Sequence, residues 1–287
     1  MAILGMLVVI GSVLGGYVGH GGKIPVLIQP TELLIIGGAA LGSVMISAPV
    51  ALIKRMMKQL TGALGGHQPD TEEYMELLKL IFEVTKMGRQ NLMGLEAHVE
   101  KPDASDIFKK YPKFLKNHHA VHFLCDTLKV QISSPMSPYD LDDLLTLDMD
   151  SAHQEENQAP AAVTKIGDAM PGLGIVAAVL GVVITMGKLT QGKDVIGQSV
   201  AAALVGTFLG ILLAYGFIQP LAAKMESNIA AEGKYLEVIK AGMVAFAKGL
   251  SPKVCLEYAR RTVPPELRPD FSEMDAATAG GAVKKAA

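Results

Sequence analysis

The sequence predicts an all-α, polytopic membrane protein with four transmembrane helices and a helical cytoplasmic domain. Half of its 287 residues are hydrophobic, and they gather in windows of about 20 residues, the length that a helix needs to cross a bilayer. A charged stretch separates the first pair of windows from the second pair. The four windows lie at 1–22, 31–53, 169–188 and 196–223.

Basic residues beside these windows predict the orientation. Positively charged flanks stay in the cytoplasm, and they follow the second window, precede the third and follow the fourth: Lys54, Arg55, Lys58, Lys165 and Lys224. Both termini are therefore expected in the cytoplasm. The first window lacks the basic start of a secretory signal, so we expect it to be retained as a span.

The chain is expected to divide at the ends of the windows. In the charged insert, "EEYMELLKLIFEV" carries an apolar stripe at helical spacing, Ser137 and Pro138 predict a helix start, and Gly249 with Pro252 predicts a helix end followed by a new helix. The expected parts are a transmembrane hairpin at 1–53, a cytoplasmic helical domain at 54–165, a second hairpin at 166–223, cytoplasmic helices at 224–275 and a disordered tail at 276–287.

The predicted spans are almost free of charge. Glu32 and Asp168 lie at helix starts on opposite membrane faces, where the helix dipole favours acids. The polar side chains within the spans are hydroxyls, and a threonine there usually bonds its own backbone; they are Thr185, Thr207 and Tyr215. An ion path needs an ionisable group, so if this protein conducts ions, the carboxylate that carries them is expected on another chain.

Two prolines lie at the cytoplasmic ends of the last two spans. Pro171 fits the first turn of a helix that starts at Asp168 or Ala169, where a missing N–H costs nothing. Pro220 has helical pattern on both sides, so it should kink its helix and free a carbonyl near Gly216. These ends of the spans are expected to bend.

Other features predict little chemistry. His118 and His122 in "HHAVH" have the spacing of metal ligands on a helix, which suggests a membrane enzyme, but without a neighbouring acid a surface histidine cluster is the better interpretation. Cys125 and Cys255 are isolated and are expected to be reduced thiols without a metal. The formal net charge of −2 gives no sign of a nucleic-acid partner.

Five segments carry a recognisable pattern: "LGMLVVIGSVLGGYVGHGG", "QPTELLIIGGAALGS", "LEAHVEKPDASDIFKKYP", "MPGLGIVAAVLGVV" and "LVGTFLGILLAYGFIQPLA". Through these segments the sequence resembles, from the first span to about residue 271, the MotA family of flagellar motor stator subunits, within the MotA/TolQ/ExbB proton channel superfamily. The resemblance implies a non-enzymatic protein of the bacterial inner membrane. The alternative within the superfamily is a TolQ- or ExbB-type energiser of an envelope machine, and the amino-terminal hairpin argues against it.

The resemblance also implies partners and roles. Family members form a ring of five around two copies of a single-span partner, MotB, whose membrane aspartate binds the ion, and ion flow turns this ring. The prolines that match Pro171 and Pro220 couple protonation to movement, and the threonine that matches Thr207 lines the ion route; Tyr215 is a further candidate for the ion pathway.

The same resemblance indicates the ion and the rotor contact. Sodium-using relatives have a threonine where this chain has Ala178, and an alanine offers no oxygen to sodium, so H⁺ is expected and Na⁺ is less favoured. Glu96 matches the acidic residue that contacts the rotor switch protein FliG. For the basic residue, Lys86 and Arg89 remain alternatives.

Overall fold

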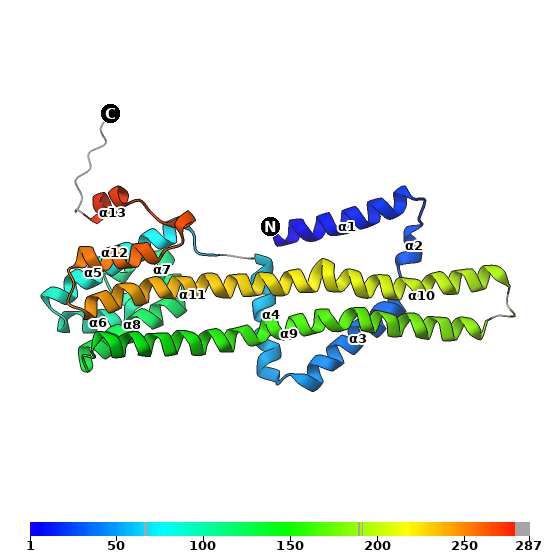
Figure 1. Cartoon of the computed structure of the whole chain (residues 1–287), viewed down its shortest axis with the longest axis horizontal. Coiled ribbons are helices and arrows are strands. Elements are labelled where there is room, and N and C mark those ends of the chain that lie inside the picture. Colours follow the sequence, from blue (N-terminus) through cyan, green and yellow to red (C-terminus); the bar gives the residue numbers. More distant parts are fainter. Residues whose placement is uncertain (66–67, 189, 191, 279–287) are drawn as a thin grey trace, which may run out of the picture. The chain divides into compact units, whose positions relative to one another are not determined.

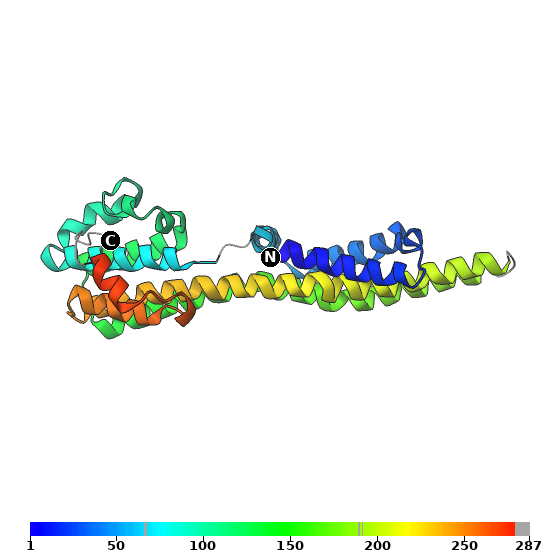
Figure 2. The ribbon, with the colours of Figure 1, turned by 90° about the horizontal axis from the view of Figure 1, so that it is seen from above.

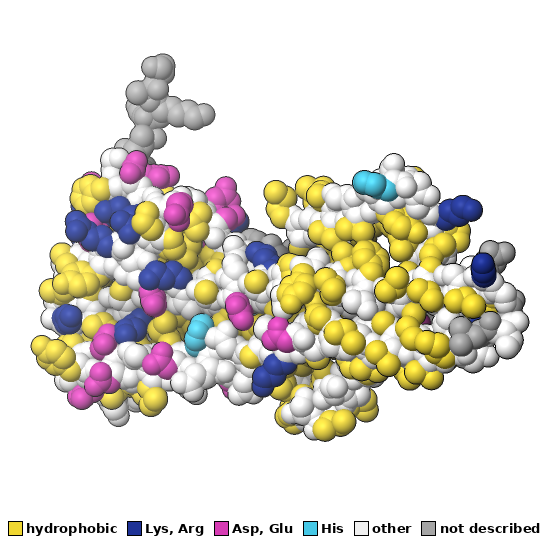
Figure 3. All heavy atoms as spheres, turned by 45° about the vertical axis from the view of Figure 1, so that its right-hand side comes forward, with side chains coloured by type: hydrophobic (Ala, Val, Ile, Leu, Met, Phe, Trp, Pro, Cys, Tyr) yellow, Lys and Arg dark blue, Asp and Glu magenta, His cyan; other side chains and the backbone are white. Residues whose placement is uncertain are grey.

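The computed structural model describes residues 1–65, 68–188, 190 and 192–278, and this part of the chain contains helices and no strand. It forms two compact units, Met1–His67 with Glu155–Asn228, and Gln68–Gln154 with Ile229–Ala287. Figure 1 shows the helices with the labels used below. In Figure 3, hydrophobic side chains cover most of the visible face of the first unit, whereas charged side chains gather over the second.

The first unit contains the apolar helices. They are α1 (Ala2–Gly19), α2 (Ile24–Leu27), α3 (Pro30–Ser47), the later part of α9 (Pro138–Met186), α10 (Lys193–Leu213), the π-helical turn η5 (Ala214–Ile218) and the start of α11 (Gln219–Ala247). Four helical segments among the described residues are long and apolar enough to cross a membrane, which confirms the four predicted spans. In both ribbon views α9 lies along α10 and α11 (Figures 1 and 2).

The second predicted span ends earlier than expected. Helix α3 stops at Ser47, and Ala48 is extended because a residue before proline avoids the helical region. A separate amphipathic helix, α4 (Val50–Gly65), follows and carries the basic residues that were expected beside the span. The boundary expected at residue 54 therefore falls inside α4, which belongs to the first unit together with Glu155 and the residues after it.

Helix α9 corrects the account of Pro171. It runs without interruption from Pro138, so both Pro160 and Pro171 lie inside it and the third span has no new helix start at Asp168 or Ala169. At Pro160 a neighbouring helix replaces the lost bond, since Gln59 of α4 donates to the carbonyl of Glu156, four residues earlier, at 3.3 Å. Tertiary contacts of this kind let a helix continue through a proline.

The second unit is a helical domain around one apolar core. It contains α5 (Thr71–Gln90), η1 (Met93–Leu95), α6 (Glu96–Glu100), η2 (Pro102–Ala104), η3 (Phe108–Lys110), α7 (Pro112–Lys116), α8 (His118–Ser133), α12 (Pro252–Thr262), η6 (Pro265–Leu267), α13 (Phe271–Thr278) and parts of α9 and α11. Asp70 and Glu73 form a reciprocal capping box at the start of α5. The predicted stripe of α5 is buried at Leu77, Leu78 and Ile81.

The expected helix boundaries in this unit largely agree with the structure. Ser137 accepts from the backbone N–H of Asp140 at 3.2 Å and so caps α9. Gly249 has a φ of +83°, and α12 starts at Pro252 as expected. Helix α13 reaches Thr278, so the first three residues of the expected disordered tail are helical; the remaining residues, 279–287, lie outside the described part.

Candidate functional site

Helices α9 and α10 meet through glycines, with their backbones in contact. A Cβ on Gly174 would lie 2.8 Å from the carbonyl oxygen of Gly206 and 3.1 Å from the Cα of Gly210. A Cβ on Gly210 would lie 2.6 Å from the carbonyl oxygen of Met170 and 2.9 Å from the Cα of Gly174. Small residues permit such an approach in membranes, and no larger residue fits at these positions without separating the helices.

This contact surrounds Thr207. Its side chain is half-buried, and its Cα would lie 3.3 Å from a Cβ on Gly174. The space that Gly210 leaves beside it is therefore occupied by the backbone of α9, and the space beside Gly206 is occupied by Glu32 together with α9. The hydroxyl of Thr207 has no hydrogen bond within the described residues, whereas Thr185 donates to the carbonyl of Gly181 at 2.7 Å, as expected for a structural threonine.

Ala178 lies on the same side of α9. Its backbone nitrogen would be 3.2 Å from a Cβ on Gly206, so the alanine is next to the glycine contact. Its methyl group offers no ligand for a cation. Tyr215, by contrast, lies in η5 with 60% of its surface exposed, and the first unit does not bring it to the glycine contact.

The segments that contain Pro171 and Pro220 touch each other. A Cβ on Gly167, the residue four before Pro171, would lie 2.9 Å from the Cγ of Gln219, which directly precedes Pro220. The side-chain amide of Gln219 donates to Oδ1 of Asp168 at 2.8 Å. We call this arrangement the proline joint: Gly167, Asp168 and Pro171 of α9 with Gln219 and Pro220 of α11.

The backbone within the proline joint is irregular. In η5 the N–H of Gln219 bonds the carbonyl of Ala214, five residues earlier, and Pro220 has no N–H to continue the pattern. The predicted disturbance near Gly216 is thus a π-helical turn. The sequence reading did not identify Gln219, and it treated Asp168 only as a dipole-favoured acid, because their bond joins residues far apart in the chain.

Glu32 is more deeply buried than its place at a helix start suggests. It lies in the first turn of α3, as predicted, but only 6% of its surface is exposed. Its Oε2 would be 2.9 Å from a Cβ on Gly206, and this oxygen has no hydrogen-bond partner in the described structure. Among the described residues it is the only buried Asp, Glu, Lys, Arg or His.

The predicted rotor residues lie in the second unit and differ in their contacts. Glu96 begins α6, and both its side chain and that of Lys86 are exposed. Neither makes a hydrogen bond or ion pair in the part of the chain that is described. Arg89 instead donates to the carbonyl of Leu250 at 3.2 Å and stacks on Phe246, with 4.6 Å from its guanidinium carbon to the ring centroid.

The histidines and cysteines form no candidate centre. His118 and His122 are exposed on α8, and no group of three or more His, Cys, Asp or Glu side chains that could hold a metal occurs among the described residues. Cys125 and Cys255 are buried free thiols, and burial raises the pKa of Cys125 to about 12. A thiol that resists ionisation is a poor nucleophile.

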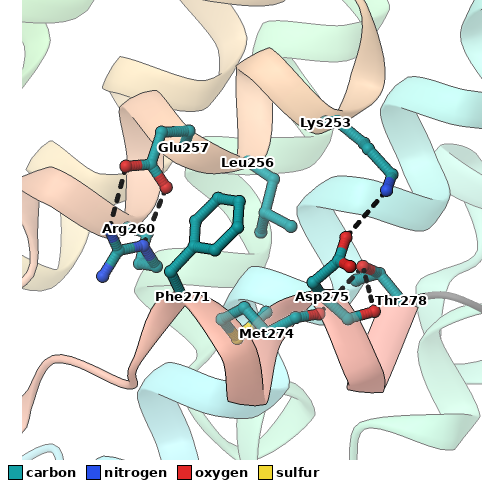
Figure 4. Close-up of a pocket in the computed structure, with 8 residues that line it drawn as sticks. All are labelled: Lys253, Leu256, Glu257, Arg260, Phe271, Met274, Asp275 and Thr278. Carbon is teal, nitrogen blue, oxygen red and sulfur yellow. Dashed lines mark hydrogen bonds and ion pairs between the residues drawn. The ribbon is translucent and has the colours of Figure 1, made fainter.

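The charged side chains that line a small hollow between α12 and α13 pair with one another. Figure 4 shows its charged residues in pairs: Lys253 of α12 lies 2.7 Å from Asp275 of α13, and Glu257 lies 2.8 Å from Arg260 within α12. The arginine pair lowers the pKa of Glu257 to about 2, chiefly through Arg260. No charge in this hollow remains for a ligand.

Comparisons with known proteins cover nearly the whole chain. Residues 3–92 match the family described as Motility protein A N-terminal, and residues 116–238 match the MotA/TolQ/ExbB proton channel family. Motility protein A of Salmonella typhimurium is 36% identical, over 96% of this chain and 94% of that protein. Chemotaxis protein LafT of Vibrio parahaemolyticus is 33% identical, over 95% and 96%.

Solved structures show the same fold. The structure of C. jejuni MotAB aligns with a TM-score of 0.77 at 19% identity, over 92% of this chain and 96% of that one. The MotAB stator complex from Bacillus subtilis aligns with a TM-score of 0.76 at 24% identity, over 93% and 96%. With matches to both family descriptions and relatives of full length, this chain belongs to the motility protein A family of the MotA/TolQ/ExbB proton channel family.

Proposed function

We propose that this chain is a stator subunit of the bacterial flagellar motor, which forms with a MotB-type single-span partner a proton-conducting complex that exerts torque on the rotor. The family match extends through both hairpins and the charged unit. The match of the amino-terminal hairpin to motility protein A favours the motor over a TolQ- or ExbB-type energiser. In this role the protein is a transducer in the inner membrane and not an enzyme.

The observation that carries the mechanism is the proline joint. Two long helices, α9 and α11, each have residues in both the first and the second unit. Each of them contains a proline at the place where they touch within the first unit. A change of charge on a neighbouring chain would alter the electrostatic field at the apolar, membrane-spanning parts of these helices. The proline joint is the place where such a change bends both helices together, because regular hydrogen bonding is already interrupted there.

The partners follow from this mechanism. The conducting carboxylate belongs to the single-span partner, and five copies of this chain surround two copies of it, as the family resemblance implies. The exposed aliphatic side chains of α1, α3, α9 and α10 suit contacts with lipid and with neighbouring subunits. The basic residues of α4 and Lys165 support the proposal that the second unit and both termini are cytoplasmic.

Lys86 and Glu96 form the proposed rotor contact with the switch protein. Both are exposed, and neither is held by another side chain of the described residues. Arg89 is the weaker candidate, because its guanidinium donates to the carbonyl of Phe246 near the end of α11 and to that of Leu250 just after it. Unpaired exposed charges are available to a partner, whereas a charge that closes a helix end is not.

Expression of this chain with its single-span partner in a bacterium that lacks both stator proteins tests the proposal. We expect swimming to be restored and the two chains to purify together. Proton flux should appear in liposomes only when both chains are present, since the partner carries the conducting carboxylate. Flux through this chain alone, or restored motility without the partner, would contradict the proposal.

Proton use is tested separately. Ala178 supplies no oxygen at the position where sodium-using relatives carry threonine, and a partly dehydrated sodium ion needs oxygen ligands. Swimming speed should therefore persist without sodium at constant proton-motive force. If the swimming speed instead followed the external sodium concentration, Na⁺ would be the transported ion.

A further inference from the structure

Among the described residues, Glu32 is the only ionisable Asp, Glu, Lys, Arg or His side chain that is buried, and no contact explains its burial. It lies in a segment that is apolar enough to cross a membrane, Ile24–Ser47. Neither an ion pair nor a hydrogen bond to its carboxyl group is formed by the described residues, and Oε2 is fully enclosed. An ionised carboxylate in such a place would cost several kcal/mol, so the enclosed form is the neutral acid.

The surroundings place this acid at a junction of three helices. On α3 itself, the apolar residues Ile36 and Ala40 pack with Met170 and Ala177 of α9 and with Ala214 of η5. At the end of that contact nearer the start of α3, a Cβ on Gly206 would meet Oε2 of Glu32 at 2.9 Å and the Cβ of Ala177 at 3.1 Å. The carboxyl group therefore occupies the space that the missing side chain of Gly206 leaves on α10.

This position adjoins the residues that line the expected ion route. Gly206 directly precedes Thr207, and the same Cβ position on Gly206 lies 3.2 Å from the backbone nitrogen of Ala178. A neutral carboxylic acid has one proton to give and, once ionised, one oxygen to receive it again. A group of this kind beside a proton route, with no structural partner, is suited to carrying the proton.

We propose that Glu32 is a proton-binding relay of this chain, which takes a proton from water on the outer side and releases it toward the conducting carboxylate of the partner. The step forms one O–H bond at the Glu32 carboxylate and breaks it on release, so no other reactant is needed. The proposal rests on the proposed function. It adds a titratable group of this chain to a path otherwise assigned to the partner.

The decisive variant is Glu32→Gln in the complex with the single-span partner. Glutamine has the shape of the neutral acid but binds no exchangeable relay proton, so folding and assembly should be unchanged. Positioned proton carriers contribute factors of about 10²–10⁴, and we expect the liposome proton flux to fall by about tenfold or more. Glu32→Asp, which still titrates, should recover part of the flux and shift its dependence on external pH.

Two controls separate the outcomes. Glu226→Gln removes an exposed acid of the same unit and should leave the flux unchanged. Infrared spectra should contain a protonated carboxylic acid band that is lost in Glu32→Gln but not in Glu226→Gln. Wild-type flux with a wild-type pH profile in Glu32→Gln would overturn the relay and leave the stator function standing, whereas absence of flux in the wild-type complex would refute the function itself.

Discussion

The contact between Gly210 and Gly174 leads to a prediction with a calculable size. In Gly210→Ala the new Cβ would lie 2.6 Å from the carbonyl oxygen of Met170, while ordinary contact begins at 3.4 Å. The two helices must therefore separate by about 0.8 Å, because the obstructing atoms are backbone and have no other rotamer. A gap of about 0.5–1 Å forfeits a quarter to a half of the van der Waals attraction along the contact.

The expected cost follows from two opposing terms. Overpacking costs about 1–3 kcal/mol, and alanine recovers about 0.5–1 kcal/mol of helix propensity over glycine. The difference is a net destabilisation of up to about 2.5 kcal/mol with a centre near 1 kcal/mol, and each kcal/mol lowers Tm by roughly 2–4 °C. The matched control is Gly197→Ala on the same helix α10, where a Cβ meets nothing within 4 Å.

The assay is thermal unfolding of the detergent-purified complex, followed by circular dichroism. Gly197→Ala should melt at or above the wild-type temperature, and Gly210→Ala should melt below it. Motility should decline with the second variant only, since separation of α9 from α10 also moves Thr207. Equal melting temperatures for the two variants would refute the close backbone contact in the assembled protein.

Three further predictions concern the proline joint, the proposed rotor contact and the ion pairs of Glu257. Pro171→Ala should leave helicity and assembly intact, since alanine extends a helix that already continues through this position, but swimming should be lost or strongly slowed; normal swimming would exclude a coupling role. Lys86→Glu should abolish torque without affecting Tm, whereas Arg89→Gln should lower Tm by breaking the end of α11; the reverse pattern in motility and melting assays would reassign the rotor contact. Glu257→Gln should cost about 1 kcal/mol at neutral pH. Because the folded pKa of Glu257 is lowered to about 2 from 4.5, this stabilisation is complete above the usual pKa and is lost as the pH falls toward 2. The difference in Tm between the wild type and Glu257→Gln should therefore become smaller in acid, and a difference that stays constant would contradict the role of the ion pairs.

Much of the fold could be predicted because it depends on local chemistry. Hydropathy over about 20 residues identifies a span regardless of its neighbours, and the four spans were found. The helix starts at Pro138 and Pro252 were also predicted, because proline fits the first turn of a helix, and Ser137 caps the first of the two. The stripe of α5 follows from the helical period alone.

The tertiary structure decided the features that join distant residues. Pro171 predicts a helix start by local rules, yet α9 continues through it because α10 and α11 support the helix from the side. Arg89 and Lys86 looked equivalent in sequence, and only the packed end of α11 separates them.

Glu32 shows the same division within one residue. The sequence by itself determined that this acid lies in the first turn of an apolar helix, since the helix dipole and the preceding proline act locally. Only the folding of α3 against α10 decided that the carboxyl group is enclosed beside Gly206. Burial depends on which surfaces meet, and a one-dimensional pattern holds no information about a glycine 174 positions further along the chain until the helices pack.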